Sequence, residues 1–114
     1  PDDAGFLNQL EEMRNRIDSI DHQIIGLLAA RMRISEEMGE FKCRSGVTVF
    51  QLERWLEILR TRTSQGAAEG LEEGFTGRII RMIHEESIRC QDEMMKKLRS
   101  TGGCIPSPDE VEEQ

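Results

Sequence analysis

The stretch "LEEMRNRIDSIDHQIIGLLAARMRISEEMGEF", residues 10–41, decides the fold because a single apolar stripe runs through it. Its members alternate in spacing between three and four residues, which keeps them on one face of an α-helix over many turns. They are Leu10, Met13, Ile17, Ile20, Ile24, Leu27, Arg31, Ile34, Met38 and Phe41. A helix of this length, about 50 Å, exceeds a compact monomer of this size and predicts packing against a second copy.

Capping patterns predict where the helices begin. Asn8 with Glu11 has the spacing of a capping box, and so has Thr48 with Gln51, which opens a second helical segment, "VFQLERWLEILRTR". The glycine-rich "SQGAAEGLEEG" predicts a loop, followed by a third helix from about Glu72 to Arg99. We expect residues 1–99 to form one helical domain and residues 100–114, rich in Gly, Pro and acidic residues, to form a flexible acidic tail.

Composition supports an all-α protein. Aromatic residues make up 4% of the chain and charged residues 32%, which favours helices with charged outer faces. The net charge of −7 argues against binding to a nucleic-acid backbone. No apolar run has the length of a membrane span, and the first residues do not have the pattern of a signal peptide, so we expect a cytoplasmic protein.

The three cysteines, Cys43, Cys90 and Cys104, contain no Cys-x-x-Cys pair. His22 and His84 are the two histidines that could join them as ligands. We therefore expect neither a zinc site nor a disulfide framework, which agrees with a reducing compartment.

Arg31 interrupts the apolar stripe with a permanent cation. Its stem could pack on the stripe while the guanidinium reaches solvent or pairs with Glu36 or Glu37. Alternatively, Arg31 could act with Lys42, which lies about 16 Å further along the helix on nearly the same face. Breaking a buried ion pair costs roughly 3–5 kcal/mol, so a bound dianion is a reasonable partner for two such cations.

Polar side chains also interrupt the stripe of the third helix, where Ser87 and Gln91 lie one turn apart. They could bond to each other and to backbone groups, or they could line a ligand pocket together with the cations. Arg14 is about 25 Å from Arg31 along one helix, but two antiparallel copies would bring Arg14 of one chain near Arg31 of the other.

Four segments, "MRNRIDSIDHQIIGLLAARM", "GEFK", "LERWLEIL" and "IHEESIRCQ", resemble in order the all-α class of chorismate mutases. The resemblance covers about residues 10–95. It implies an intertwined, domain-swapped homodimer of three-helix subunits with a long first helix. It also implies a Claisen rearrangement of chorismate to prephenate, with no covalent intermediate, no cofactor and no metal.

The resemblance also assigns roles by position. Arg14 from the partner subunit and Arg31 would hold the two substrate carboxylates, since a bidentate guanidinium fixes both position and plane. Lys42 and Gln91 would donate hydrogen bonds to the ether oxygen, where negative charge develops in the transition state.

Four further positions complete the expected site. Arg54 and Ser87 would contact the ring side of the substrate. Trp55 stands where the family usually has a glutamate that binds the substrate hydroxyl, and Gln51 stands where it often has an acid. Trp55 could instead be a packing residue, and Gln51 could serve only as the cap partner of Thr48.

Two other functions compete with this interpretation. Isochorismate pyruvate lyase shares the fold and uses similar cations on a related substrate. A non-catalytic helical dimerisation or regulatory module would need the cations only for structure. Family members are often fused to other enzymes of aromatic amino-acid synthesis. Because the chain starts at Pro1 and ends in an acidic tail, we expect the C-terminal mutase domain of such a fusion, for example with DAHP synthase.

Overall fold

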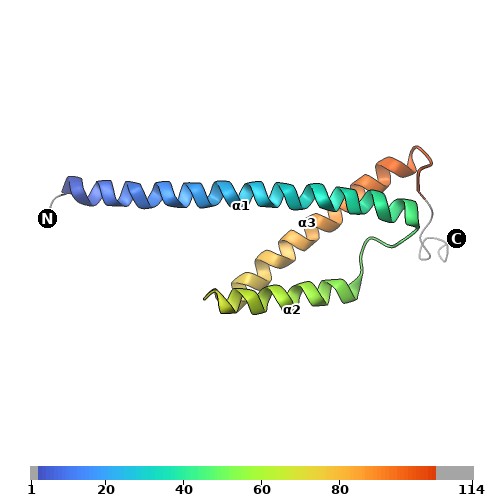
Figure 1. Cartoon of the computed structure of the whole chain (residues 1–114). Helices are drawn as coiled ribbons and strands as arrows, with labels where there is room; N and C mark the ends of the chain where they lie inside the picture. Colours follow the sequence, from blue (N-terminus) through green and yellow to red (C-terminus); the bar gives the residue numbers. More distant parts are fainter. Residues whose placement is uncertain (1–2, 105–114) are drawn as a thin grey trace. The chain divides into compact units, whose positions relative to one another are not determined.

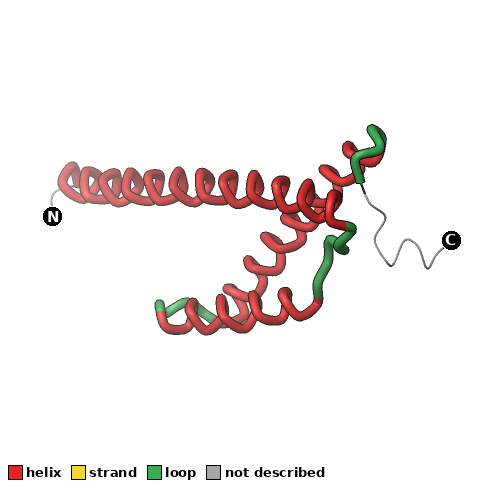
Figure 2. Tube along the Cα trace, turned by 45° about the vertical axis from the view of Figure 1, so that its right-hand side comes forward, coloured by secondary structure: helices red, strands yellow, loops and turns green. Residues whose placement is uncertain are grey.

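The computed structural model describes residues 3–104, which form three helices joined by short connections (Figures 1 and 2). Helix α1 spans Asp3–Ser45, α2 spans Leu52–Ala68 and α3 spans Glu73–Arg99. Within the described range there is no strand, so the predicted all-α class with a long first helix is confirmed. The chain divides after Arg31 into two units, and α1 contributes to both.

The first unit is the N-terminal part of α1. The helix begins at Asp3, an acidic residue that favours the positive end of the helix dipole. The predicted start at Asn8 is therefore wrong, because Asn8 lies inside the helix. The apolar stripe of this unit is exposed along its length, from Met13 at 55% to Leu27 at 70%.

The second unit contains the end of α1 together with α2 and α3. Two glycines allow close helix contacts: a Cβ added to Gly39 would lie 2.6 Å from the carbonyl oxygen of Gln91, and one added to Gly66 would lie 2.6 Å from Oγ1 of Thr76. The buried hydrophobic side chains of this unit are few. They include Cys43, Ile58, Cys90 and Met95.

Helix α2 differs from the predicted segment at both ends. It begins at Leu52, and its N-cap residue Gln51 makes no side-chain capping bond, so the predicted box with Thr48 is wrong. It also continues through the segment from Ser64 to Ala68, which was expected to be a loop. The glycine in that segment, Gly66, serves a close contact with α3 and does not end the helix.

Helix α3 begins where the sequence predicts. The N-cap carboxylate of Glu72 accepts hydrogen bonds from the backbone N–H groups of Gly74 (2.9 Å) and Phe75 (2.7 Å). These two bonds lower the pKa of Glu72 because they favour its charged form. The first turn of α3 is thus fixed by its own sequence.

A tight turn follows α3 and returns the chain toward α1. Gly102 has a positive φ of 76°, and Gly103 donates its N–H to the Leu98 carbonyl at 2.9 Å, as in a Schellman motif. Cys104 then forms a disulfide with Cys43, with their Cα atoms 4.6 Å apart. The expectation of no disulfide is wrong, because the 61-residue separation in sequence does not reveal that this turn brings the two residues together.

The predicted tail, residues 100–114, is thus described only over its first five residues. The rest of that prediction, residues 105–114, lies outside the described residues. Over residues 3–104, none of the helices combines the length and apolar character needed to cross a bilayer.

Candidate active site

A lysine and an amide form the centre of the candidate site. The Lys42 ammonium, in the last turn of α1, donates to Oε1 of Gln91 on α3 at 2.7 Å. It also donates to the carbonyl oxygen of Val49, in the connection before α2, at 2.8 Å. Two residues that the sequence predicts as catalytic, 49 positions apart, are therefore in direct contact.

Gly39 makes this contact possible. It lies one turn before Lys42 and is buried, and its lack of a side chain lets the α1 backbone approach the Gln91 backbone. Gly39 is the first residue of the "GEFK" motif, and the sequence alone did not predict a role for it. Its position inside a predicted helix was the signal that could have identified it. Glycine there lowers helix stability by about 1 kcal/mol relative to alanine, so its presence indicates a close packing contact.

The polarity of the pair suits an oxygen ligand. An ammonium has three N–H donors, and two of them bond to Gln91 and Val49, so the third is suited to a ligand. Because Oε1 of Gln91 accepts from Lys42, the amide NH₂ group is the part that can donate elsewhere. Burial lowers the pKa of Lys42, since it disfavours the charged ammonium.

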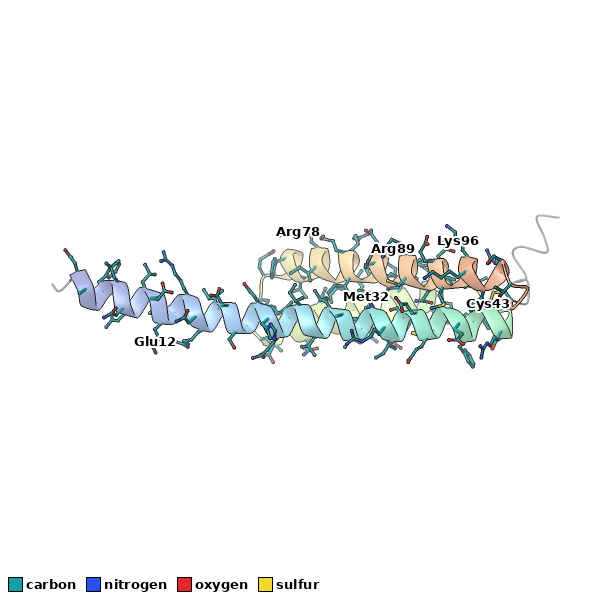
Figure 3. All side chains as sticks on the ribbon, turned by 90° about the horizontal axis from the view of Figure 1, so that it is seen from above. Glu12, Met32, Cys43, Arg78, Arg89 and Lys96 are labelled. Carbon is teal, nitrogen blue, oxygen red and sulfur yellow. A yellow bond between two sulfur atoms is a disulfide. The ribbon has the colours of Figure 1, made fainter. Side chains whose placement is uncertain are left out.

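Ser87 lies one turn before Gln91 on the same face of α3. Its side chain is 4% exposed, as is that of Gln91, so both polar interruptions of the α3 stripe are buried against neighbouring elements. The Ser87 hydroxyl lies 3.7 Å from Sδ of Met32 on α1, which points toward α3 in Figure 3. The contact places Ser87 between these two helices.

The predicted α2 residues have different surroundings. Arg54 forms an ion pair with Glu57 on the exposed face of α2, and Gln51 is exposed at the N-cap. The Trp55 ring stacks on His84 of α3, with ring centroids 4.5 Å apart and an interplanar angle of 22°. That geometry matches the packing alternative for Trp55.

His84 belongs to an aromatic cluster that sequence reasoning did not single out. Phe50 meets its ring edge-on at 6.0 Å, and the Arg81 guanidinium lies 5.7 Å from the centroid of the Trp55 ring. Phe50 follows Val49, the residue whose carbonyl accepts from Lys42. The cluster therefore adjoins the connection that holds the lysine.

The two remaining predicted residues, Arg14 and Arg31, lie in the first unit. Arg14 is exposed and reaches Glu11 at 4.0 Å, while Arg31 is half-buried at the end of the unit. Within the second unit the structure thus brings together Lys42, Gln91 and Ser87, whereas the two arginines belong to the other unit. Among residues 3–104, no group of three or more His, Cys, Asp or Glu side chains is placed to hold a metal ion.

These features define a class of protein: an all-helical chain in which a half-buried ammonium and buried neutral polar side chains lie between two helices. The profile of the chorismate mutase type II family matches residues 13–92, and the chain belongs to that family. The match contains every predicted site residue.

Known relatives are similar at modest identity. The T-protein of Enterobacter agglomerans is 29% identical over 85 residues, which is 75% of this chain and 23% of the relative. The bifunctional chorismate mutase/prephenate dehydratase of Buchnera aphidicola subsp. Schizaphis graminum is 29% identical over 90 residues, and that of Escherichia coli strain K12 is 27% identical over 90 residues. Each of these two matches covers 79% of this chain and 23% of the relative. The chain therefore spans about a quarter of the length of these relatives.

Proposed function

We propose that the chain is a chorismate mutase, which rearranges chorismate to prephenate in the synthesis of phenylalanine and tyrosine. The observation that carries the proposal is the hydrogen bond from the half-buried Lys42 on α1 to the buried Gln91 on α3, in a chain of the chorismate mutase type II family. Relatives named bifunctional chorismate mutase/prephenate dehydratase support the same activity.

The reaction is intramolecular and needs no nucleophile from the protein. The ether C–O bond breaks while a C–C bond forms, and negative charge develops on the ether oxygen. The third ammonium N–H of Lys42 and the amide NH₂ of Gln91 stabilise that charge. Losing one such preorganised donor typically lowers the rate by about 10²–10³.

The substrate is a dianion that must be held in a folded conformation. In this proposal Arg31 binds one carboxylate and Arg14 of the partner subunit binds the other, within an intertwined homodimer. The exposed stripe of the first unit supports a second copy, because a soluble chain rarely exposes so many apolar side chains along one helix face.

The remaining contacts are assigned by position. Arg54 and Ser87 contact the ring side of the substrate, while Gln51 and Trp55 lie nearest its hydroxyl. No cofactor and no metal take part. We also propose a cytoplasmic location, and a fused or associated DAHP synthase domain as a partner.

The test is the loss of chorismate by ultraviolet absorbance, with prephenate identified by mass, for the wild type and Lys42→Met. The matched control is Arg44→Met, which removes a cation from the same helical turn where Glu40 pairs with it at the surface. We expect conversion by the wild type and the control, and a loss of about 10²–10³ for Lys42→Met. Release of pyruvate and salicylate from isochorismate instead would identify a lyase, and no conversion of either substrate would reject an enzymatic role.

A further inference from the structure

We infer that the Cys43–Cys104 disulfide is a site of thiol–disulfide exchange that controls how firmly the Lys42–Gln91 pair is held. Cys43 directly follows Lys42 in the last turn of α1 (Figure 3), and Cys104 follows the helix that carries Gln91. The bond thus joins the two elements whose contact forms the candidate site. Its effect on activity rests on the proposed function, whereas its effect on stability does not.

The two sulfur atoms differ in accessibility. Cys43 is 0% exposed, whereas Cys104 is half-buried at the end of the turn after α3. Cys104 Sγ lies 3.5 Å from the carbonyl oxygen of Met95, a residue only 2% exposed. The bond therefore joins a cysteine in the packed interior of the second unit to a less buried one, Cys104, and we take Cys104 as the cysteine that an external thiol attacks.

This difference sets the course of the exchange. An external thiolate attacks Sγ of Cys104, the S–S bond breaks, and Cys43 leaves as a thiolate that takes up a proton. A second external thiol then releases Cys104 from the mixed disulfide. In sum, two thiols of the reductant become one disulfide and the protein gains two thiols, while an oxidised small-molecule disulfide reverses the reaction.

Within residues 3–104, opening the bond removes the one disulfide that cross-links α1 to the turn after α3. The 61-residue separation between the two cysteines encloses all of α2 and α3, so the bond restricts the unfolded chain strongly. In the reduced state the turn is held by backbone hydrogen bonds to α3, such as Gly103 to Leu98. The last turn of α1, with Lys42, then depends on noncovalent packing alone.

The experiment compares the full chain equilibrated with glutathione disulfide and with dithiothreitol. The denatured protein should titrate with one free thiol, Cys90, in the first case and with three in the second. We expect the oxidised form to melt more than about 5 °C higher. We also expect it to convert chorismate several-fold faster.

Two variants separate the possible outcomes. Cys104→Ser should remove both differences, and Cys90→Ser, which changes the cysteine outside the bond, should keep them. Three thiols under oxidising conditions, or an equal response of wild type and Cys104→Ser, would overturn the inference. If the melting temperature shifts but turnover does not change, the inference that the disulfide controls the Lys42–Gln91 pair is wrong. If neither form converts chorismate but the thiol count and melting shift appear, the proposed function fails and the exchange site stands.

Discussion

The two parts of α1 differ in whether they bury any residue of the chain. Before Arg31, large apolar side chains such as Ile17 and Ile20 are exposed along one face. After it, large apolar side chains such as Phe41 are exposed as well, but this part also buries three small residues, Ser35, Gly39 and Cys43, spaced four apart. Large side chains offer area to another molecule, whereas small ones let a neighbouring backbone approach closely. The small-residue face therefore packs within its own chain next to the candidate site, while the large apolar face is available to a partner.

The largest effect is expected from Gly39→Ala. The added Cβ would meet the Gln91 backbone at 2.6 Å, and since backbone cannot move aside as a side chain can, α1 and α3 must separate. We expect turnover to fall at least as far as in Lys42→Met and the free energy of unfolding to fall by about 1–3 kcal/mol. Chorismate assays and urea unfolding measure the two effects, and unchanged turnover would contradict the close contact.

The next largest effect is expected from a charge placed in the exposed apolar stripe of α1 before Arg31. Ile17→Glu places a charge in the apolar stripe, so we expect the homodimer to dissociate and turnover to fall by about tenfold or more as Arg14 of the partner subunit is lost. Sedimentation velocity measures the association. The control is Ser19→Glu, which adds the same charge on the opposite side of the helix. Equal behaviour of the two variants would show that the stripe does not mediate association.

A smaller effect is expected from the ionisation of Lys42: raising the pH should change the free energy of unfolding and the turnover in opposite directions. Burial lowers the pKa of Lys42 in the folded protein, so between the folded and the unfolded pKa the unfolded chain binds more protons. Stability from this group therefore rises with pH in that window, while turnover, which needs the ammonium, falls. Alkaline pH series of unfolding and turnover should diverge in the wild type. The stability rise should be absent in Lys42→Met.

The smallest effect is expected from Gly26→Ala in the first part of α1. No atom lies within 4 Å of the position where its Cβ would be, so alanine should raise the free energy of unfolding by up to about 1 kcal/mol through helix propensity. Urea unfolding of Gly26→Ala and Gly39→Ala under the same conditions measures the two changes in free energy of unfolding side by side. A loss of stability at Gly26 would show that this face of the helix is packed.

Sequence patterns predicted the three helices and the buried polar positions Ser87 and Gln91, because periodicity reports which face of a helix is buried. They did not predict the helix starts at Asp3 and Leu52, and at Leu52 the N-cap residue Gln51 makes no side-chain capping bond. They also missed the disulfide, since pairing over 61 residues depends on the tertiary fold. The small-residue face of α1 was overlooked because the adjacent apolar stripe dominates the pattern.

The most direct measurement mixes two variants, Arg14→Ala and Lys42→Met, after unfolding and refolding them together. Each should be inactive alone, because each lacks one group at every site. In a mixed dimer, one site has Lys42 from the first chain and Arg14 from the second, so random pairing should restore about a quarter of wild-type turnover. Recovery to that level is expected if each chain supplies Lys42 to its own site and Arg14 to the site of its partner. A mixture that stays as inactive as its components would contradict it.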